Sequence, residues 1–309
     1  MNTSEDQTFR DSHHANIAFS TFYIFIFIIA VPGNALAFWA FCRRQSTSPS
    51  KVFLMNLSVA DISYVLILPM RIVYHLSGNQ WPFGRILCHV AGFLFYLNMY
   101  CSLYLMSFIS LDRCVAVVFP LKSRLMRKPA YARVVVGILW LIVIVCMSPL
   151  LLLKKHVTNN STAVCSQLYL ENTSPKALVS TVVAFAIPFI TIIISYIVIL
   201  LKLRTVPQHG ERPVKDKAIK IIILIMLNFL FAFVPYHVSR VIYIQNRSSM
   251  TAASYESLAQ SNRITSALTC VSGVLDPVMY FFLNHVYRNT LLHMFSNVVQ
   301  TCTERSMQT

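Results

Sequence analysis

Residues 134–153 read VVVGILWLIVIVCMSPLLLL, and no charged side chain interrupts them. As an α-helix, a run of about 20 residues is about 30 Å long, which matches the hydrocarbon core of a bilayer. Residues 19–41 form a second run of this kind. Of the 309 residues, 56% are hydrophobic and only 12% are charged, whereas about 25% are charged in a typical soluble domain. The sequence therefore predicts an integral membrane protein.

Similar apolar segments recur at about residues 19–42, 51–76, 86–118, 130–153, 176–203, 215–245 and 256–283. Each segment is predicted to be a helix, because backbone polar groups in lipid must be satisfied within the segment itself. A shorter amphipathic stretch after residue 284 is predicted to lie along the membrane surface. We therefore expect an all-α membrane protein, a seven-transmembrane helix bundle with a short amphipathic eighth helix. Its parts are an N-terminal tail (1–18), a transmembrane domain (19–283), and helix 8 with a short tail (284–309).

The basic residues predict the orientation of the chain. Segments 43–51, 113–133, 202–220 and 284–309 hold 17 of the 26 Lys and Arg residues, so they are expected in the cytoplasm. The N-terminus is then extracellular and the C-terminus cytoplasmic. Candidate glycosylation sites at Asn2, Asn159, Asn160, Asn172 and Asn246 all fall on the predicted outside.

The net charge of +15 does not indicate a nucleic-acid partner, because the basic residues lie in short pieces between apolar runs and suit membrane lipids.

Eight cysteines are too few for a disulfide scaffold. Only Cys88 and Cys165 fall on the predicted outside, where oxidation to a disulfide can occur. A bridge between them would tie the third helix to the second extracellular loop. The alternative is a pair of free thiols.

Two carboxylates lie inside predicted spans, Asp61 in the second and Asp276 in the seventh. Charged residues at this depth are unfavourable unless they face the bundle interior, so they are functional candidates. With Asn98, Ser102 and Asn34 they offer the oxygen ligands of a hard cation such as an allosteric sodium ion. The alternative is a packed polar network in which one carboxylate is protonated. No other cofactor is expected.

The marks of one receptor family occur in order along almost the whole chain. They are Gly33-Asn34, Leu57 to Asp61, Asp112-Arg113, Trp140, Pro188 with Tyr196, Pro235, and Asp276-Pro277 with Tyr280. In this pattern the chain resembles the rhodopsin-like (class A) G-protein-coupled receptors, and no single mark would suffice. The resemblance implies ligand binding outside, helix movement, and nucleotide exchange on a heterotrimeric G protein inside, at the plasma membrane. The residues implied for activation and coupling are Asp112, Arg113, Tyr196, Phe233, Pro235, Asp276, Pro277 and Tyr280.

Three further stretches, residues 81–84, 95–100 and 233–240, are similar to the purinergic-type branch of nucleotide, cysteinyl-leukotriene and lysophospholipid receptors. The chain departs from the wider family at Cys114, where a tyrosine is usual, and at Phe233, where a tryptophan is common. Many relatives also join the N-terminal tail to the third extracellular loop by a disulfide. Neither segment contains a cysteine here.

The outer halves of the helices indicate the ligand's charge. Amine receptors carry an aspartate where this chain has Phe95, so a cationic amine is not expected. Arginine binds phosphate or carboxylate by paired hydrogen bonds, and tyrosines can stack on a base or flank an acyl chain. An anionic small-molecule or lipid ligand is therefore expected at Arg71, Tyr96, Tyr100, Tyr236, His237, Arg240 and Arg263. Alternatively the arginines reach lipid headgroups or pair with Glu171 and Glu256.

A nucleotide predicts a polar vestibule open to water, whereas a lysolipid or leukotriene predicts an apolar crevice that opens sideways to the bilayer. Other classes remain as alternatives. A transporter would show an internal repeat, and none is detectable. A ligand-independent, constitutively active receptor or scaffold would keep every mark above. An enzyme is not expected, because the sequence has no metal-ligand spacing, phosphate loop or nucleophile elbow.

Overall fold

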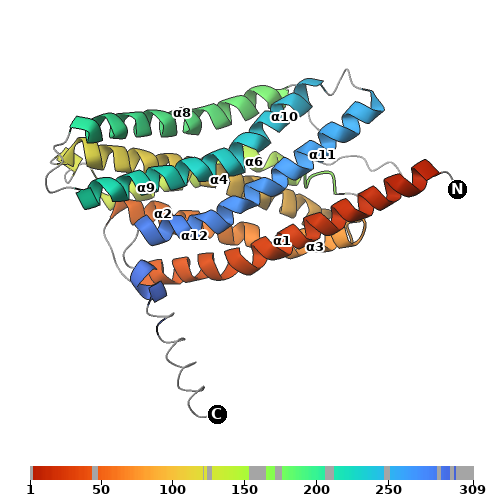
Figure 1. Cartoon of the computed structure of the whole chain (residues 1–309), viewed down its shortest axis with the longest axis horizontal. Helices are drawn as coiled ribbons and strands as arrows, with labels where there is room; N and C mark the ends of the chain where they lie inside the picture. Colours follow the sequence, from red (N-terminus) through yellow and green to blue (C-terminus); the bar gives the residue numbers. More distant parts are fainter. Residues whose placement is uncertain are drawn as a thin grey trace, which may run out of the picture.

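A computed structural model of the chain describes residues 3–43, 48–120, 122–123, 127–152, 165–170, 176–205, 212–246, 251–283, 287–292 and 296. Its helices include 7 that are long and apolar enough to cross a membrane: His13–Arg43, Pro49–Leu76, Gly84–Val118, Pro129–Leu151, Ala177–Arg204, Ile222–Asn246 and Ser254–Leu283. They lie side by side along the long axis of the molecule (Figure 1). The predicted seven-helix bundle is confirmed, and the described residues contain no strand.

Several spans consist of more than one helical element. The first span belongs to α1 (Thr3–Arg43), the second to α2 (Pro49–Val65) and α3 (Leu68–Leu76), and the third to α4 (Gly84–Val118). The fourth belongs to α6 (Pro129–Met147) and α7 (Pro149–Leu152), and the fifth to α8 (Lys176–Thr205). The sixth contains α9 (Arg212–Asn228), the π-helix η1 (Phe229–Phe233) and α10 (Val234–Asn246). The seventh contains α11 (Ala252–Leu268), the 3-10 turn η2 (Thr269–Val271) and α12 (Ser272–Leu283). Helix α1 begins at Thr3, inside the segment predicted as an N-terminal tail.

Prolines account for two of these breaks. Pro69 has no N–H to donate to the carbonyl four residues earlier, and the second span is interrupted there, between α2 and α3. In the sixth span Pro235 follows η1, where the N–H of Val234 donates to the carbonyl of Phe229, five residues earlier. Such π-turns inside α-helices are rare and frequently occur at functional sites.

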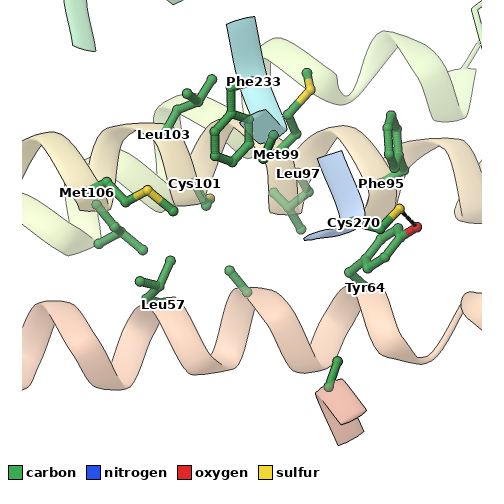
Figure 2. Close-up of a cluster of buried hydrophobic side chains, with 14 of the residues drawn as sticks. Leu57, Tyr64, Phe95, Leu97, Met99, Cys101, Leu103, Met106, Phe233 and Cys270 are labelled. Carbon is green, nitrogen blue, oxygen red and sulfur yellow. Dashed lines mark hydrogen bonds between the residues drawn. The ribbon is translucent and has the colours of Figure 1, made fainter. Parts of the chain in front are cut away.

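Helix α4 lies at the centre of the bundle and contacts α2, α6, α7 and α8. From Phe95 to Met106 almost every side chain is buried, on all sides of the helix. Figure 2 shows this region, with Leu57 and Tyr64 of α2, Phe233 of η1 and Cys270 of η2 around it. A helix that is apolar all round is expected in such a central place. Because α4 passes through this core, its residues connect the two ends of the molecule.

Helices α1 and α12 approach each other closely. A Cβ atom on Gly33 would lie 2.8 Å from Cγ of Pro277, so a larger residue would not fit there. Next to it, Asn34 donates to the carbonyls of Ala30 (3.0 Å) and Gly273 (2.8 Å). These two bonds join the first and last spans. They also use both N–H groups of the amide. The sequence analysis grouped Asn34 with the carboxylates Asp61 and Asp276, but among the described residues no hydrogen bond joins it to either.

Residues 287–292 form the described part of the eighth helix. Tyr287 is buried, with its ring 6.0 Å from that of Tyr280 and 6.3 Å from that of Phe41. Arg288 and Leu292 are exposed. One face thus packs on the bundle and the other does not, as an amphipathic surface helix requires.

Candidate functional site

The start of α4 carries a short loop segment, Cys165–Leu170, which we call the plug. The predicted disulfide between Cys88 and Cys165 is present and ties the plug to α4. One turn further along α4, a Cβ atom on Gly92 would lie 2.8 Å from the backbone carbonyl oxygen of Gln167. Only glycine allows the loop backbone to come so close. We call this end of the bundle the disulfide end, and the opposite end of α4 the Arg113 end.

Beneath the plug lies Arg71 of α3, whose side chain is 0% exposed. It donates to the hydroxyl of Tyr23 and to the carbonyl of Leu168, each at 3.1 Å. Its guanidinium carbon lies 4.3 Å from the ring centre of Phe95 and 5.2 Å from that of Tyr169. Such cation–π contacts stabilise a desolvated arginine. Among the described residues no carboxylate forms an ion pair with Arg71.

Tyr169 is the side chain of the plug that reaches the helices. Its hydroxyl lies 2.8 Å from Nε2 of His75 and 3.5 Å from the hydroxyl of Tyr23, and its carbonyl accepts from Asn262 at 2.9 Å. Burial raises the pKa of the Tyr169 phenol well above its ordinary value, so the ring stays neutral. Tyr169 therefore solvates Arg71 by dipoles and π-electrons without neutralising its charge.

A second cationic group lies on α10. His237 and Arg240 are buried, three residues apart on one face of the helix. Nδ1 of His237 lies 2.8 Å from the carbonyl of Phe233 and must donate to it. The other ring nitrogen, Nε2, has no partner among the described residues, and neither does Nη1 of Arg240. As with Arg71, no described carboxylate forms an ion pair with Arg240.

The predicted ligand residues thus come together at one end of the bundle. Tyr96 and Tyr236 are buried, and their ring centres lie 4.7 Å and 6.5 Å from that of Phe95, the ring on which Arg71 packs. The ring of Tyr100 lies 6.3 Å from that of His237. The guanidinium of Arg263 lies 5.9 Å from the ring of Tyr169. Tyr23 and Tyr169 were not predicted; the only sequence signal for Tyr169 was its place four residues after Cys165.

The two carboxylates in the membrane occupy one polar cluster at the middle of the bundle. Asp61 accepts from Asn98 at 3.2 Å and from Tyr280 at 3.3 Å, and Asn98 also reaches Ser102 at 3.4 Å. Asp276 accepts from Asn228 at 2.8 Å. Asn228 was not predicted. All these side chains are buried, and no described cation pairs with either carboxylate.

This oxygen-rich donor set fits a small hard cation. The alternative, a packed polar network in which one carboxylate is protonated, relieves the repulsion between two buried carboxylates without a cation. The predicted ion residues Asp61, Asn98, Ser102 and Asp276 therefore lie together, and the cluster suits either occupant.

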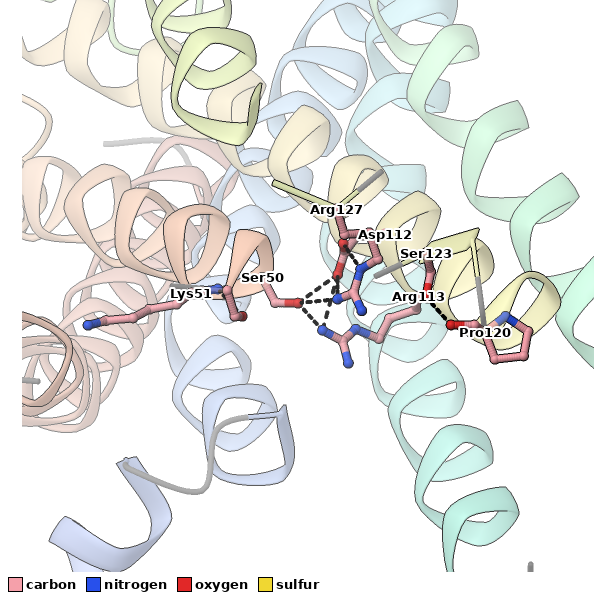
Figure 3. A network of polar contacts seen from close by, with 8 residues as sticks. Ser50, Lys51, Asp112, Arg113, Pro120, Ser123 and Arg127 are labelled. Carbon is pink, nitrogen blue, oxygen red and sulfur yellow. Dashed lines mark hydrogen bonds and ion pairs between the residues drawn. The ribbon is translucent and has the colours of Figure 1, made fainter. Parts of the chain in front are cut away.

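At the Arg113 end the described network centres on Asp112 (Figure 3). Its carboxylate accepts from Ser50 at 2.6 Å and from both Nε and Nη2 of Arg127 at 2.7 Å. Arg113 donates to the same carboxylate at 3.1 Å and also to the hydroxyl of Ser50. The sequence predicted Asp112 and Arg113, but not Arg127, which it placed only among the basic residues of segment 113–133. Two parallel bonds from one guanidinium form the stronger pairing, so Arg127 is the principal partner of Asp112.

The other predicted activation residues lie between the two ends. Tyr196 of α8 is buried with its hydroxyl 2.9 Å from that of Ser110, which precedes Asp112 by two residues. Phe233 is buried in η1, and Pro235 directly follows that element. Tyr280 and Pro277 lie on α12 beside the carboxylate cluster. Tyr196, Phe233 and Tyr280 thus lie buried in the bundle interior.

Of the predicted glycosylation sites, Asn246 is exposed at the disulfide end of α10, where its amide donates to the carbonyl of Ile242 at 3.0 Å. Asn2, Asn159, Asn160 and Asn172 lie outside the described residues.

Comparison with known proteins extends these observations. Residues 33–280 match the family model of the 7 transmembrane receptors (rhodopsin family). The chain is 48% identical to the human uracil nucleotide/cysteinyl leukotriene receptor over 282 residues, which cover 90% of this chain and 77% of the relative. It is 32% identical to the mouse cysteinyl leukotriene receptor 1 over 284 residues (89% and 81%). It is also 32% identical to a human purinoceptor over 271 residues (82% and 71%).

Proposed function

The chain belongs to the rhodopsin family of seven-transmembrane receptors, and we propose that it binds an anionic extracellular ligand and activates heterotrimeric G proteins. Proteins of this family are receptors, and this membership excludes both the enzyme and the transporter alternatives. The first two relatives named above are receptors for uracil nucleotides or cysteinyl leukotrienes by their names, and both ligand classes carry negative charge. The buried arginines at the disulfide end of this chain would bind a ligand of this negative charge.

One observation carries the ligand proposal. Arg71 and Arg240 are almost completely buried, at 0% and 3% exposed, and no described carboxylate pairs with either. Burying a charge without a counter-ion is strongly unfavourable, so proteins rarely retain such groups without a use for them. A phosphate or carboxylate that bridges Arg71 and Arg240 between Tyr96 and Tyr236 would supply the missing charge. Lipid headgroups do not account for this pair, because buried groups cannot reach the membrane surface.

The orientation follows the same proposal. The disulfide end, with the plug and exposed Asn246, faces the outside of the plasma membrane, and the Arg113 end faces the cytoplasm. Support comes from the distribution of lysine and arginine and from the one-sided sequons. The Cys88–Cys165 disulfide also belongs in an oxidising compartment. On the inner side, Arg113, Tyr196 and Tyr280 would carry the change that admits the G protein.

The carboxylate cluster is proposed as a regulatory sodium site. A cation bound by Asp61, Asn98 and Ser102 would hold Asp276 and Asn228 in the arrangement seen here. Raising the sodium concentration should then lower agonist affinity. An Asp61→Asn variant should lose that sensitivity, and an unchanged sodium response in this variant would leave the shared-proton alternative.

A receptor active without ligand is the second candidate. It is favoured by the plug, because Tyr169 and the carbonyl of Leu168 already contact Arg71 where a ligand group would bind. Under this reading the plug acts as a tethered agonist. The buried charge on Arg71 nevertheless stays uncompensated, which is why the anionic ligand is the main proposal.

The test uses cells that lack related receptors. G-protein activation is recorded without ligand and then with uridine nucleotides, cysteinyl leukotrienes or lysophospholipids. Arg240→Ala should raise the half-maximal concentration of the active ligand by about 10- to 100-fold, because a hydrogen bond to a charged group contributes about 1.5–3 kcal/mol. Arg85→Ala, which removes an exposed arginine at the same end, is the matched control. Basal activity that no ligand changes and only Arg113→Ala abolishes would replace the ligand proposal by the tethered-agonist reading.

A further inference from the structure

Asn228 is the last residue of α9 and lies inside the sixth span, where it is 2% exposed. Its Nδ2 donates to Oδ1 of Asp276 at 2.8 Å. The amide oxygen of Asn228 has no hydrogen-bond partner among the described residues, and neither has Oδ2 of Asp276, a residue that is 0% exposed. Buried polar atoms normally have a partner. The bond between the two side chains thus leaves one unsatisfied oxygen on each of them.

The two unsatisfied oxygens are both acceptors, so they cannot satisfy each other. Each belongs to the same amide or carboxylate group as an atom of the 2.8 Å bond, so the two oxygens lie on groups in contact. A cation would satisfy both at once, because amide and carboxylate oxygens are the ligands that hard cations prefer. The alternatives are a water molecule and a proton on Asp276 that is donated to Asn228. Neither alternative makes ion binding depend on the oxygen of Asn228.

The π-turn η1 explains how the sixth span presents an amide to this cluster. Asn228 and His237 are nine residues apart, which is about two and a half turns of an uninterrupted α-helix and would place them on opposite faces. The wider turn at Phe229–Phe233 takes up roughly one extra residue, so the angle between them falls to about 80°. Both residues are accordingly 2% exposed, while Phe231 between them is 63% exposed. The π-turn thus lets one span serve the cationic site and the carboxylate cluster together.

We propose that Asn228 supplies an oxygen ligand to the cation of the carboxylate cluster, so that the bound ion joins the sixth span to the seventh. The inference rests on the sodium site proposed above and adds to it a ligand from another span. Helix α9 packs against α12, and the ion fastens them through Asn228 and Asp276. Straightening of η1 would rotate Asn228 away from Asp276 and remove this ligand. Sodium therefore opposes movement of α9 away from α12.

The test measures how sodium stabilises the purified full-length receptor in the absence of any agonist. The thermal midpoint is recorded as sodium chloride replaces choline chloride at constant ionic strength, and the half-effective sodium concentration is taken from the curve. Asn228→Leu removes the oxygen and the N–H groups, whereas Asn228→Asp keeps an oxygen and removes only the N–H groups. Asp61→Asn removes a carboxylate of the site itself.

Asn262→Leu is the matched control. Asn262 is 1% exposed, and its amide also has an N–H group that donates, to the carbonyl of Tyr169, and an oxygen without a partner among the described residues. It lies at the disulfide end, under the plug. The same substitution there removes the same buried groups without touching the carboxylate cluster.

We expect Asn228→Leu to raise the half-effective sodium concentration at least about tenfold, because even the outer partners of metal ligands contribute about 10- to 100-fold to affinity. Asn262→Leu should change it by less than about twofold, as a distant site. Asn228→Asp should keep or lower it, since a carboxylate oxygen then takes the place of the amide oxygen. If both Asn228 variants raise it equally, Asn228 only positions Asp276 through its N–H group, and the inference is overturned.

An unchanged sodium response in Asn228→Leu would also overturn the inference and would leave water or a shared proton between the two side chains. If Asn228→Leu does not fold, Asn228→Asp decides alone. A half-effective concentration at or below that of the unaltered receptor supports the inference, and a higher one contradicts it. If sodium does not stabilise the unaltered receptor, or still stabilises Asp61→Asn equally, the proposed sodium site itself fails.

Discussion

Arginines gather at both ends of the bundle, in opposite electrostatic surroundings, half-buried at the Arg113 end and fully buried at the disulfide end. At the Arg113 end, Asp112 accepts hydrogen bonds from two guanidinium groups, and Ser50 links them. At the disulfide end, Arg71 and Arg240 have rings, hydroxyls and a carbonyl around them and no described carboxylate. The first arrangement gives both arginines a carboxylate partner within the protein and can act as a latch. In the second arrangement only neutral groups among the described residues contact the arginines.

The largest expected effect separates the two ends directly. Arg71→Met removes one uncompensated charge and should weaken the response to an anionic ligand by roughly 100-fold, since about 3 kcal/mol of charge-assisted bonding is lost. Basal activity should not change, because the Asp112 network is untouched. Concentration–response curves for G-protein activation, corrected for surface expression, measure both quantities. A shift of less than threefold would mean that Arg71 is a structural group shielded by the plug.

Asp112→Asn makes the Arg113 end resemble the disulfide end, because its arginines lose their carboxylate partner. Arg113 and Arg127 would then lie close together without a counter-ion, and their repulsion should favour the open form. Breaking a buried pair is strongly unfavourable, but these arginine side chains are 28% and 24% exposed, so solvent screening reduces the effect. We expect basal activity to rise by about tenfold, which corresponds to about 1.4 kcal/mol. Unaltered basal activity would show that Asp112 does not hold the receptor closed.

Arg127→Met tests whether the latch depends on the loop arginine. It removes the two 2.7 Å bonds to Asp112 and leaves the 3.1 Å bond from Arg113. Basal activity should rise about threefold, less than in Asp112→Asn, because one arginine still pairs with the carboxylate. Arg127→Lys should restore the closed state only in part, since lysine cannot form the paired geometry. Full restoration by lysine would indicate that charge alone matters.

The smallest effect concerns the neutral shell around Arg71. Gly92→Ala would place a Cβ atom 2.8 Å from the carbonyl of Gln167, so the plug must shift. Overpacking of this kind destabilises a protein by about 1–3 kcal/mol, and we expect the lower end of that range. The thermal midpoint of the purified receptor should fall by about 2–4 °C. Gly137→Ala, where no atom lies within 4 Å of the added carbon, is the control and should leave the midpoint unchanged.

The features that the sequence predicted are those that hydropathy and helix spacing control. The seven spans follow from apolar length, and the face shared by His237 and Arg240 follows from their separation by three residues. Membrane sidedness singled out Cys88 and Cys165 as the available pair. Each of these is a property of one element or of one side of the membrane.

The residues that were missed depend on how separate elements meet. Tyr169 lies in an irregular loop whose path is set by a disulfide and by the close approach to Gly92, and no periodic pattern encodes that path. Arg127 is one of several basic residues in segment 113–133, and only the fold places it on Asp112. Asn228 pairs with Asp276 across two spans, one of them interrupted by a π-turn. Conversely, Asn34 was grouped with the buried carboxylates, but its amide joins α1 to α12 instead.

The plug has a consequence for the kinetics of binding. Tyr169 covers Arg71, and the loop that carries it is fastened to α4 at Cys165. A ligand that has reached Arg240 must therefore wait for Tyr169 to leave before it can engage Arg71. The frequency of that departure is a property of the receptor and does not depend on ligand concentration. Association should accordingly show a fast phase that scales with concentration, followed by a slow phase whose rate reaches a ceiling.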